Sequence, residues 1–498
     1  MTRFFLLARP RSSWIAALGA AVLAGCGGGS SGPEVAAAPQ VKIAFSAPQV
    51  STGESATLTW SSTNASSCAA SGNWTGAQPA SGSATFVLSA AGSFIYHLDC
   101  TGTGGTAGGE AVVAVVSTAV PVAPPTPVAA VPPPAGAPVL TNVLSVVVDR
   151  GPSGTSFNMP FVSVTVCSPG TTTCRTVDHI LVDTGSTGLR LMASALGSGI
   201  DLPVIATSAG LPVAECAQFA SGFTWGSVRR ADIRLAGETA ARMPVQLISD
   251  PSAPFSVTPT ACSNTGADLG SVAALGANGI LGVDMSVQDC GATCVTSTAP
   301  RLYYGCTSTA CTTTVLPLES QVTNPVAAFA VNNNGLALTL PPVQVGGAAT
   351  VLGTLTFGIG TQTNNQLDRA TVFTTNSRGQ FTTVYKGTTY PSGFVDSGSN
   401  GLFFDDASIP TCSSFYCPSA PLALTAINVS PSGATVSVSF TIDNARLLTA
   451  GISAFNLGGT LGLTRTFDFG LPFFFGRTVF VALQGAQTPK GVGPYLAY

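Results

Sequence analysis

The chain has 498 residues, of which only 8% are charged, and its formal net charge is −3. It contains no basic block to neutralise a phosphate backbone and no glycine-rich loop followed by lysine, which excludes nucleic-acid binding and phosphate-loop chemistry. A Ser-His-Asp or Cys-His mechanism would depend on one of only two histidines, His97 and His179, and neither lies in a fitting sequence context.

The amino terminus has the features of an export signal. Arg3, Arg9 and Arg11 precede an apolar stretch over residues 14–24, which is too short for an ordinary transmembrane helix but suits the core of a signal peptide. We therefore predict that residues 1–25 are a signal peptide. Its removal takes away three arginines and no acidic residue, so the formal charge falls from −3 to −6.

The signal ends in Leu-Ala-Gly-Cys, which is typical of bacterial lipoproteins. Small residues before Cys26 let the signal peptidase cut there after the thiol has been acylated, so Cys26 is predicted to become a lipidated first residue that carries palmitate-type chains. The alternative is a plain secretory signal with an incidental cysteine. Gly27 follows where an aspartate would favour the inner membrane, which predicts an outer-membrane anchor in the cell envelope. Whether it faces the periplasm or the cell surface is left open.

Two connecting segments and one β-rich module are predicted between the anchor and the main region. Residues 26–40 are small and polar, as in a flexible tether, and residues 118–140 are rich in proline and alanine, as in an extended linker. Between them, residues 41–117 carry short alternating stretches separated by turns, which predicts a small β-sandwich.

The predicted sandwich has a candidate core residue and a candidate disulfide. Trp60 is expected to fill the core, and Cys68 and Cys100 are expected to join the two sheets. These features resemble those of bacterial immunoglobulin-like modules. A spacer role is the simpler interpretation, and binding of a cell-envelope ligand is the alternative.

The 358 residues from 141 to 498 are enough for a large core in two lobes. Helical periodicity is slight, and apolar or alternating stretches predict strands nearly throughout, hence a mainly β fold. The clearest predicted strands lie at residues 144–148, 161–166, 231–235, 245–248, 336–340, 352–357, 435–442 and 479–483.

Two short strings in this region share one pattern. Residues 180–186 read Ile-Leu-Val-Asp-Thr-Gly-Ser and residues 393–399 read Gly-Phe-Val-Asp-Ser-Gly-Ser. Each places an aspartate on a glycine turn after an apolar run, and each continues into a Gly-Leu pair. Because Asp-x-Gly is ordinary turn chemistry, two unrelated turns are the alternative. A spacing of 213 residues between Asp183 and Asp396 suits one turn per lobe.

Aspartates on two such turns can meet as a carboxylate pair. Two carboxylates about 3 Å apart cannot both ionise, so they share one proton and titrate as a pair. One then acts as a base toward water and the other as an acid toward a peptide carbonyl, which gives hydrolysis without a covalent intermediate. No cofactor or metal is predicted. The predicted catalytic residues are Asp183 and Asp396, supported by the turn residues Thr184, Gly185, Ser186, Ser397, Gly398 and Ser399.

Thirteen cysteines minus Cys26 leave twelve, an even number that fits disulfides in an oxidising compartment. Four of them, Cys290, Cys294, Cys306 and Cys311, allow three pairings. A metal site is the alternative for these four, disfavoured because secretion favours disulfides and no histidine lies nearby. The other predicted pairs are Cys68 with Cys100, Cys167 with Cys174, Cys216 with Cys262, and Cys412 with Cys417.

From about residue 143 onward the chain resembles a pepsin-type bilobal aspartic peptidase, as found in a group of uncharacterised bacterial lipoproteins. Beyond the aspartate turns, residues 279–282 (Gly-Ile-Leu-Gly) resemble the segment that threads behind the first catalytic turn, and residues 470–480 resemble its second-lobe counterpart. Residues 219–237 resemble the flap hairpin and the strand after it. The resemblance implies a double β-barrel with lobes at residues 141–345 and 346–498.

Two positions depart from the family pattern. Phe219 is the best match to the flap tyrosine and lacks its hydroxyl, and Arg190 replaces the tryptophan that partners this tyrosine. A cation near the aspartate pair would favour its doubly ionised form and lower its pKa values, which would weaken the acid role at neutral pH.

Two functions remain. The favoured one is a lipid-anchored cell-envelope aspartic endopeptidase that cuts extended peptides with apolar side chains beside the cut. The alternative is a catalytically inactive protein on the same fold that acts in binding or in envelope structure. The intact aspartates favour the first, whereas Phe219 and Arg190 favour the second. The expected partners are a peptide or protein substrate and the membrane.

Overall fold

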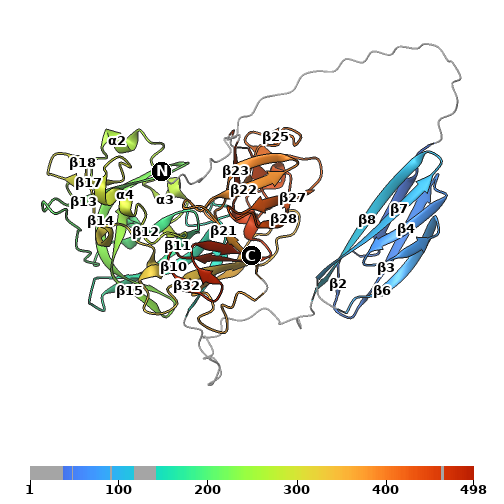
Figure 1. Ribbon diagram of the computed structural model, residues 1–498, viewed down its shortest axis with the longest axis horizontal. Helices are drawn as coiled ribbons and strands as arrows, with labels where there is room; N and C mark the ends of the chain where they lie inside the picture. Colours follow the sequence, from blue (N-terminus) through green and yellow to red (C-terminus); the bar gives the residue numbers. More distant parts are fainter. Residues whose placement is uncertain are drawn as a thin grey trace, which may run out of the picture. The chain divides into compact units, whose positions relative to one another are not determined.

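The computed structural model describes residues 37–47, 49–89, 92–116, 142–368, 370–460, 462 and 465–498. The chain forms two compact units, one within Trp14–Ala137 and one within Pro138–Tyr498 (Figure 1). The predicted signal peptide, the lipidated Cys26, most of the tether and the linker lie outside the described residues. Within those residues, no helix has both the length and the apolar character needed to cross a membrane.

The described part of the first unit is a β-sandwich of two sheets. Alternate residues of β3 (Ser55–Thr63) are buried, among them Trp60, whose ring lies 5.0 Å from that of Trp74 and edge-on to it. One sheet has the order β1 (Gln40–Phe45), β3, β6 (Ser81–Val87), and the other has the order β2 (Gln49–Ser51), β8 (Gly105–Val116), β7 (Gly92–Gly102), β4 (Ser67–Gly72), β5 (Gly76–Gln78).

The predicted Cys68–Cys100 disulfide is present, but it lies within one sheet. Cys68 on β4 faces Cys100 on β7 in direct register, and these strands are neighbours. The prediction that this bond joins the two sheets is therefore wrong. Contacts between aromatic rings, such as Trp60 with Trp74, fill the space between the sheets instead. The resemblance to immunoglobulin-like modules stays a prediction.

One large sheet organises the second unit. Six of its strands close on themselves into a barrel, because β14 pairs with both β15 and β10. In the described residues the sheet has the order β18 (Cys311–Thr313), β17 (Tyr303–Cys306), β13 (Val213–Phe219), β14 (Gly222–Leu235), β15 (Glu238–Ile248), β12 (Thr187–Met192), β16 (Gly279–Val283), β11 (Cys174–Asp183), β10 (Pro160–Cys167), β9 (Val143–Val148), β20 (Val351–Phe357), β19 (Gly335–Leu340), β31 (Arg477–Ala482), β34 (Tyr495–Ala497), β21 (Val372–Thr374).

This sheet links the two lobes. β9, at the start of the unit, pairs antiparallel with β20, and β19 pairs with β20 on one side and with β31 on the other. The predicted lobe boundary at residues 345/346 falls between β19 and β20, two neighbouring strands of the shared sheet. The platform beneath the lobes is thus built from chain segments some 200 to 330 residues apart.

A second sheet forms the body of the second lobe, drawn in orange and red in Figure 1. Aromatic rings fill its core, including Phe404 and Phe467, which stack 4.6 Å apart. Its order is β25 (Thr411–Cys412), β26 (Phe415–Tyr416), β29 (Gly458–Gly459), β24 (Leu402–Phe403), β30 (Thr466–Phe469), β23 (Thr388–Val395), β22 (Phe381–Tyr385), β27 (Leu422–Val429), β28 (Thr435–Ile442), and a small ribbon pairs β32 (Gln487–Thr488) with β33 (Gly491–Val492).

Helices in the described residues are single turns, in agreement with the slight helical periodicity of the sequence. They are α1 (Ala193–Leu196), α2 (Thr260–Ser263), α3 (Val272–Leu275), α4 (Ala292–Thr296), η1 (Leu318–Ser320), η2 (Pro325–Ala328), η3 (Ala445–Leu447) and η4 (Leu471–Phe474).

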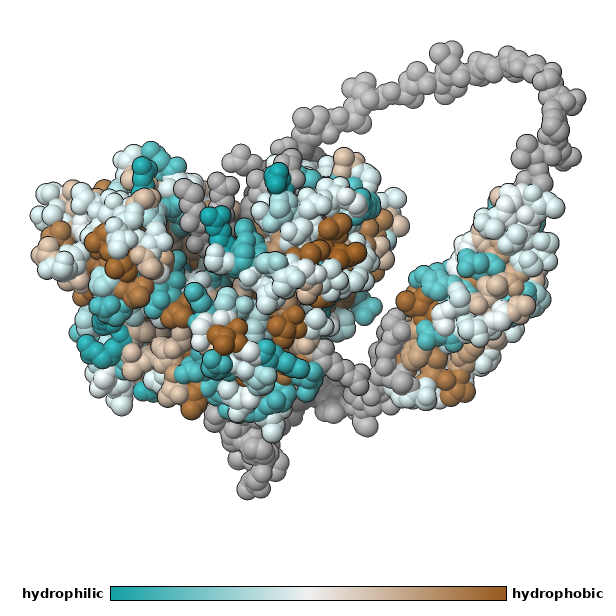
Figure 2. Space-filling view, in the orientation of Figure 1, coloured by the Kyte–Doolittle hydropathy of each residue, from teal (hydrophilic) through white to brown (hydrophobic). Residues whose placement is uncertain are grey.

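The mainly β prediction is confirmed, and each of the eight stretches predicted in the main region overlaps an observed strand. The surface also fits the composition. On the face in Figure 2, pale and teal residues predominate and brown residues form small separate patches. Few charges are needed for such a surface because Ser, Thr and Gly supply much of its polarity.

Candidate active site

Asp183 and Asp396 lie at two turns that are built the same way. β11 ends at Asp183, and β23 ends at Val395, immediately before Asp396. In each lobe a third strand lies between the strand before the turn and the strand after it, parallel to the first and antiparallel to the second. This strand is β16 in the first lobe and β30 in the second. The repeated sequence pattern therefore corresponds to a repeated structure.

Glycine is required where the third strand passes the turn. A β-carbon on Gly282 would lie 2.8 Å from the Ser186 carbonyl oxygen, and one on Gly470 would lie 2.1 Å from the Gly401 carbonyl oxygen. Both are too close for a real side chain. The second-lobe counterpart of β16 is therefore β30 with Gly470 at its end. The prediction that placed it at residues 470–480 began too late, because η4 and β31 occupy that segment.

The two aspartates face each other between the lobes. A β-carbon on Gly398 would lie 2.7 Å from Asp183 Oδ1 and 3.1 Å from Asp396 Oδ1, so both carboxyls lie against the same backbone position. The exposed fraction is 3% for Asp183 and 0% for Asp396. The structure thus brings the two predicted catalytic residues together in a site that is nearly closed to bulk water.

Each carboxyl accepts two hydrogen bonds from its own turn. One oxygen accepts from the backbone amide two residues later, and the other accepts from the serine hydroxyl three residues later, which fixes the orientation of the carboxyl plane. These bonds are Gly185 N to Asp183 Oδ1 (2.9 Å), Ser186 Oγ to Asp183 Oδ2, Gly398 N to Asp396 Oδ1 (2.8 Å) and Ser399 Oγ to Asp396 Oδ2 (2.9 Å).

Thr184 and Ser397 tie the two turns to each other. The Thr184 amide donates to Ser397 Oγ at 3.0 Å, and the Ser397 amide donates to Thr184 Oγ1 at 2.9 Å. The Ser397 hydroxyl in turn donates to the Val182 carbonyl at 2.7 Å. All of these atoms are buried, so the separation of the aspartates is set by bonds that cross between the lobes.

Replacing Thr184 with valine, or Ser397 with alanine, is expected to lower the free energy of unfolding by about 1–3 kcal/mol, because each change leaves a buried amide without its acceptor. Urea unfolding at pH 7 would measure this. Thr425→Val is the matched control, since the Thr425 hydroxyl bonds only to another exposed hydroxyl. Equal stability of the Thr184 and Thr425 variants would contradict a role for the cross-lobe bonds.

The electrostatics separate the roles of the two aspartates. Burial raises the pKa of Asp396 well above the usual aspartate range, and the charges of Asp183 and Asp468 raise it further, while the Ser399 hydroxyl lowers it. Two carboxyls this close share one proton. Asp396 is therefore the group favoured to carry that proton, which leaves Asp183 as the base.

Asp284 adds a third acidic group next to Asp183. Its Oδ1 accepts hydrogen bonds from the Thr187 hydroxyl at 2.5 Å and from the Ser286 amide at 2.9 Å. Burial raises the pKa of Asp284 to about 6, and the charge of Asp183 contributes in the same direction, whereas the Thr187 hydroxyl lowers it. Asp284 therefore titrates in the pH range where hydrolysis by an aspartate pair is expected.

Asp284→Asn is expected to flatten the pH dependence of stability. An unfolded aspartate ionises near pH 4 and folded Asp284 near 6, so the native state binds the extra proton and wild-type stability falls as pH rises between these values. Over this pH range the free energy of unfolding of the variant should fall by roughly 1–2 kcal/mol less than that of wild type. This figure is smaller than the full pKa difference would give, because the side chain of Asp284 keeps some exposure to solvent. Thermal unfolding from pH 4 to 7 tests this, with the exposed Asp201→Asn as control. Parallel curves for wild type and Asp284→Asn would show that the titration is not linked to folding.

A β-hairpin covers the cavity side of the site. β13 and β14 pair antiparallel, from Ala214 opposite Ser227 to Phe219 opposite Gly222. The chain turns at Ala220 and Ser221, which confirms a hairpin at the predicted flap. Phe219 at its tip is 7% exposed, and the Arg190 guanidinium carbon lies 5.9 Å from the centre of its ring. The two positions that depart from the family pattern are therefore in contact, as a cation over an aromatic face.

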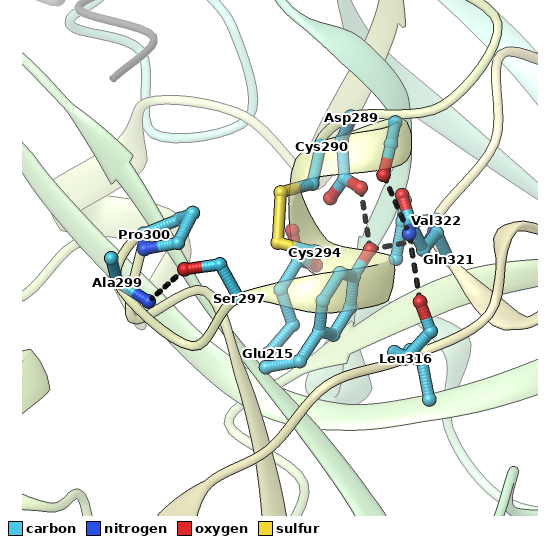
Figure 3. The surroundings of a disulfide bond; sticks show 12 residues. Glu215, Asp289, Cys290, Cys294, Ser297, Ala299, Pro300, Leu316, Gln321 and Val322 are labelled. Atoms are coloured by element: carbon cyan, nitrogen blue, oxygen red, sulfur yellow. Dashed lines mark hydrogen bonds between the residues drawn. A yellow bond between two sulfur atoms is a disulfide. The ribbon is translucent and has the colours of Figure 1, made fainter.

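Arg190 is part of a buried charge network. Its Nη2 donates to Glu215 Oε1 at 2.5 Å and to Asp289 Oδ2 at 3.2 Å, and the Tyr303 hydroxyl donates to Asp289 Oδ1 at 2.5 Å. Figure 3 shows Glu215 and Asp289 beside the disulfide that Cys290 forms. Glu215 lies on β13, so this network ties the flap hairpin to β12, the strand after the Asp183 turn.

The network neutralises Arg190 locally. Burial lowers the pKa of Arg190, but Glu215 and Asp289 outweigh it and the net direction is upward. Burial, followed by the charge of Glu215, raises the pKa of Asp289 well above the usual range. The expectation that Arg190 lowers the pKa of the aspartate pair is wrong, because the pKa of Asp396 is raised and Arg190 is not among its causes.

A cavity of about 520 Å³ opens beside Asp183, beneath the flap hairpin. Ser186, which donates to Asp183, lies in its wall, so the cavity adjoins the Asp183 turn although neither aspartate lines it. The wall combines apolar and charged side chains, among them Phe219, Leu302, Arg190 and Asp289.

All six disulfides expected from the twelve cysteines are present. The four pairs predicted individually are confirmed. The open set resolves as Cys290–Cys294 and Cys306–Cys311, each within a local loop. These four cysteines are therefore joined as disulfides and do not form the alternative metal site.

Four acidic residues of the site were missed by sequence reasoning: Glu215, Asp284, Asp289 and Asp468. Only Asp468 left a clear signal, since it interrupts the apolar run Phe467-Asp-Phe469 next to a required glycine. A charged residue inside an apolar strand is unusual and marks a position worth examining. The other three lie in segments of mixed polarity where an acidic residue is ordinary.

Comparison with known proteins gives a matching family and similar solved structures. A search of curated proteins finds no significant match. An aspartic proteinase from Irpex lacteus is similar in structure, with 17% identity and a TM-score of 0.42, over 71% of this chain and 96% of that chain. At this similarity the chemistry has to rest on the geometry above. Residues 138–498, well over half of the sequence, match a single family. The chain therefore belongs to the family described as "Protein of unknown function (DUF3443)".

Proposed function

We propose that this protein is an aspartic endopeptidase that hydrolyses extended peptides with Asp183 and Asp396. The observation that carries the proposal is the carboxyl pair itself: two buried aspartates from equivalent turns lie against Gly398. Such a pair, with one member of raised pKa, is what acid and base catalysis by two chemically identical groups requires.

The mechanism follows from the protonation of the pair. Asp183 accepts a proton from a water molecule held between the carboxyls while protonated Asp396 donates a hydrogen bond to the scissile carbonyl oxygen. The water oxygen attacks the carbonyl carbon, and the proton of Asp396 passes to the oxygen of the tetrahedral intermediate. Collapse of the intermediate breaks the C–N bond as the proton held by Asp183 passes to the leaving nitrogen. The proton on the intermediate returns to Asp396, which restores the starting state.

The cavity beneath the flap hairpin supports an extended substrate. A peptide between the flap and Asp183 would place one side chain in the cavity of about 520 Å³. Phe219 and Leu302 suit an apolar side chain, in line with the sequence prediction. On sequence grounds, the proposal includes a lipid anchor at Cys26 and a location at the outer membrane. The proposed substrates are peptides or proteins of the cell envelope.

A second candidate is a binding or envelope-structural protein that has lost hydrolysis. It is favoured by the flap, where Phe219 has no hydroxyl to donate toward a substrate and the neighbouring Arg190 is committed to Glu215 and Asp289. In this case the cavity would bind a peptide without cutting it.

Cleavage in oxygen-18 water tests the proposal. The full chain, with an unfolded protein as substrate, is expected to give new carboxyl termini that carry one heavy oxygen, because hydrolysis takes the added oxygen of each new carboxyl group from water. Mass spectrometry of the products also gives the side chains beside each cut. Intact substrate after long incubation at every pH from 3 to 8, together with saturable binding of the same substrate, would instead establish the second candidate.

A further inference from the structure

A third aspartate, Asp468, lies behind the catalytic pair at a position where the other lobe has an apolar residue. On β30, Asp468 pairs with Phe394 of β23 and with Phe403 of β24. Counting back from the glycine next to each catalytic turn, Asp468 is two residues before Gly470 and Ile280 is two residues before Gly282. At this position a carboxyl replaces a buried aliphatic side chain, and its partner across the sheet is Phe403 where Ile280 has Arg190.

Within the described part of the chain, Asp468 has no charged partner of the kind that usually accompanies a buried carboxyl. It is 0% exposed, and neither carboxyl oxygen has a hydrogen bond of ordinary geometry. No ion pair of the described residues includes it. Burial without a charged partner strongly disfavours the ionised form of a carboxyl, so its presence calls for an explanation.

The titratable groups near Asp468 are the two catalytic aspartates. Asp396 comes from the turn after β23 and Asp183 from the turn after β11, and the charge of Asp183 acts on Asp468 while that of Asp468 acts on Asp396. Of the other elements packed against β30, β24 is Leu-Phe and η4 is Leu-Pro-Phe-Phe. β22 and β23 bring the phenols of Tyr385 and Tyr390 against Phe467, the residue before Asp468, and these are neutral at the pH values of interest. Among the described residues, no ion pair offsets the charge of the three acids.

The Ser399 hydroxyl connects Asp468 to the pair. It donates to Asp396 Oδ2 at 2.9 Å, and it also lies close enough to Asp468 to lower the pKa of that carboxyl. Burial is the largest effect and, with a smaller contribution from the charge of Asp183, it holds the pKa of Asp468 well above its usual range. Asp468 is thus coupled to the catalytic pair through Ser399 and through charge.

We propose that Asp468 is a positioning residue that makes the Asp183–Asp396 pair keep its shared proton to higher pH, so that the site works closer to neutrality. The proposal rests on the peptidase function proposed above.

The direction follows from the order of ionisation. The working pair has one negative charge and one proton. When pH rises further, ionisation of Asp468 places a second charge beside Asp396, and this charge opposes loss of the shared proton. Groups coupled in this way shift one another by about one pH unit or more. With an uncharged residue at position 468, the shared proton would leave at lower pH and the alkaline limb of activity would move down.

The test compares wild type with Asp468→Asn and Asp468→Ile. Asparagine keeps the shape of the side chain, and isoleucine reproduces the equivalent position of the first lobe, so at least one of the two is expected to fold. Asp443→Asn is the matched control: Asp443 is buried, burial raises its pKa, and its neighbours are Gly346 and Asn456 rather than the catalytic pair. The alkaline midpoint of kcat/KM is expected to fall by about one pH unit in both Asp468 variants and to stay unchanged in Asp443→Asn.

A second readout keeps this proposal separate from the peptidase function. In protein labelled with carbon-13 at aspartate carboxyls, the resonance absent from Asp396→Asn identifies Asp396. Its titration midpoint is expected to fall by about one unit in the Asp468 variants, whether or not the wild type cuts any substrate. An unchanged midpoint of Asp396 in folded Asp468→Asn and Asp468→Ile would overturn the proposal. Absence of cleavage with a shifted midpoint would overturn only the peptidase function.

Discussion

Replacing Asp183 or Asp396 with asparagine is expected to lower kcat for peptide cleavage by at least about 10³-fold while the protein stays folded. Asparagine has the shape of aspartate but neither takes up nor gives up a proton at these pH values. Either change leaves one carboxyl without its partner. The site can then no longer both activate the water molecule and polarise the substrate carbonyl. The measurement is initial-rate cleavage of a fluorogenic peptide at the optimum pH.

Stability separates loss of chemistry from loss of fold in this experiment. Burial of Asp396 beside Asp183 opposes folding at neutral pH, so Asp396→Asn is expected to unfold at the same or a higher temperature than wild type. Asp443→Asn, which changes a buried aspartate outside the site, should keep full activity. A folded Asp183→Asn or Asp396→Asn protein with more than about a tenth of wild-type kcat would rule out the assigned roles.

Replacing Arg190 with methionine is expected to lower the free energy of unfolding by about 3–5 kcal/mol at pH 7. The side chains of Arg190 and Glu215 are 4% and 0% exposed, and that of Asp289 is 5% exposed. Methionine preserves much of the side-chain volume but leaves both acids buried without their cation. Since the network joins the flap hairpin to the strand after the Asp183 turn, KM for peptides is also expected to rise.

Urea unfolding measures this loss of stability. Two further variants test whether the loss comes from the buried ion pair. Arg378→Met changes an exposed arginine and should stay within about 0.5 kcal/mol of wild type. The double variant Arg190→Met/Glu215→Leu removes the carboxylate that the single change leaves unpaired, and it should recover part of the loss. If the double variant were less stable than the single one, the ion pair would not be the cause.

The sequence was sufficient to predict features that depend on short segments. The turns at Asp183 and Asp396 each need an apolar strand before them and a glycine within them, and both requirements are visible in seven residues. Strand alternation is equally local, as are pairs such as Cys167 with Cys174, which face each other across one hairpin. Within the sandwich, β4 and β5 show no hydrophobic period, because they consist mostly of alanine, serine and glycine.

Other features depend on contacts between distant segments, and these could not be predicted. Arg190 meets Glu215 and Asp289, which are 25 and 99 residues away. Its charge therefore looked free in the sequence although the fold neutralises it. The same holds for the platform shared by the lobes, where β9 pairs with β20 across some 200 residues. The Cys68–Cys100 pair was predicted correctly, but its place within one sheet depended on strand order, which the sequence left undetermined.

The most direct test of the central claim is cleavage of an unfolded, disulfide-free protein by the full chain between pH 3 and 7, with Asp183→Asn and Asp396→Asn assayed in parallel. The account predicts that wild type cleaves the substrate and that its activity varies with pH as the aspartate pair gains or loses its shared proton. It also predicts loss of activity in both variants. No cleavage at any pH by folded wild type that contains its six disulfides would contradict it, as would equal cleavage by wild type and the two variants.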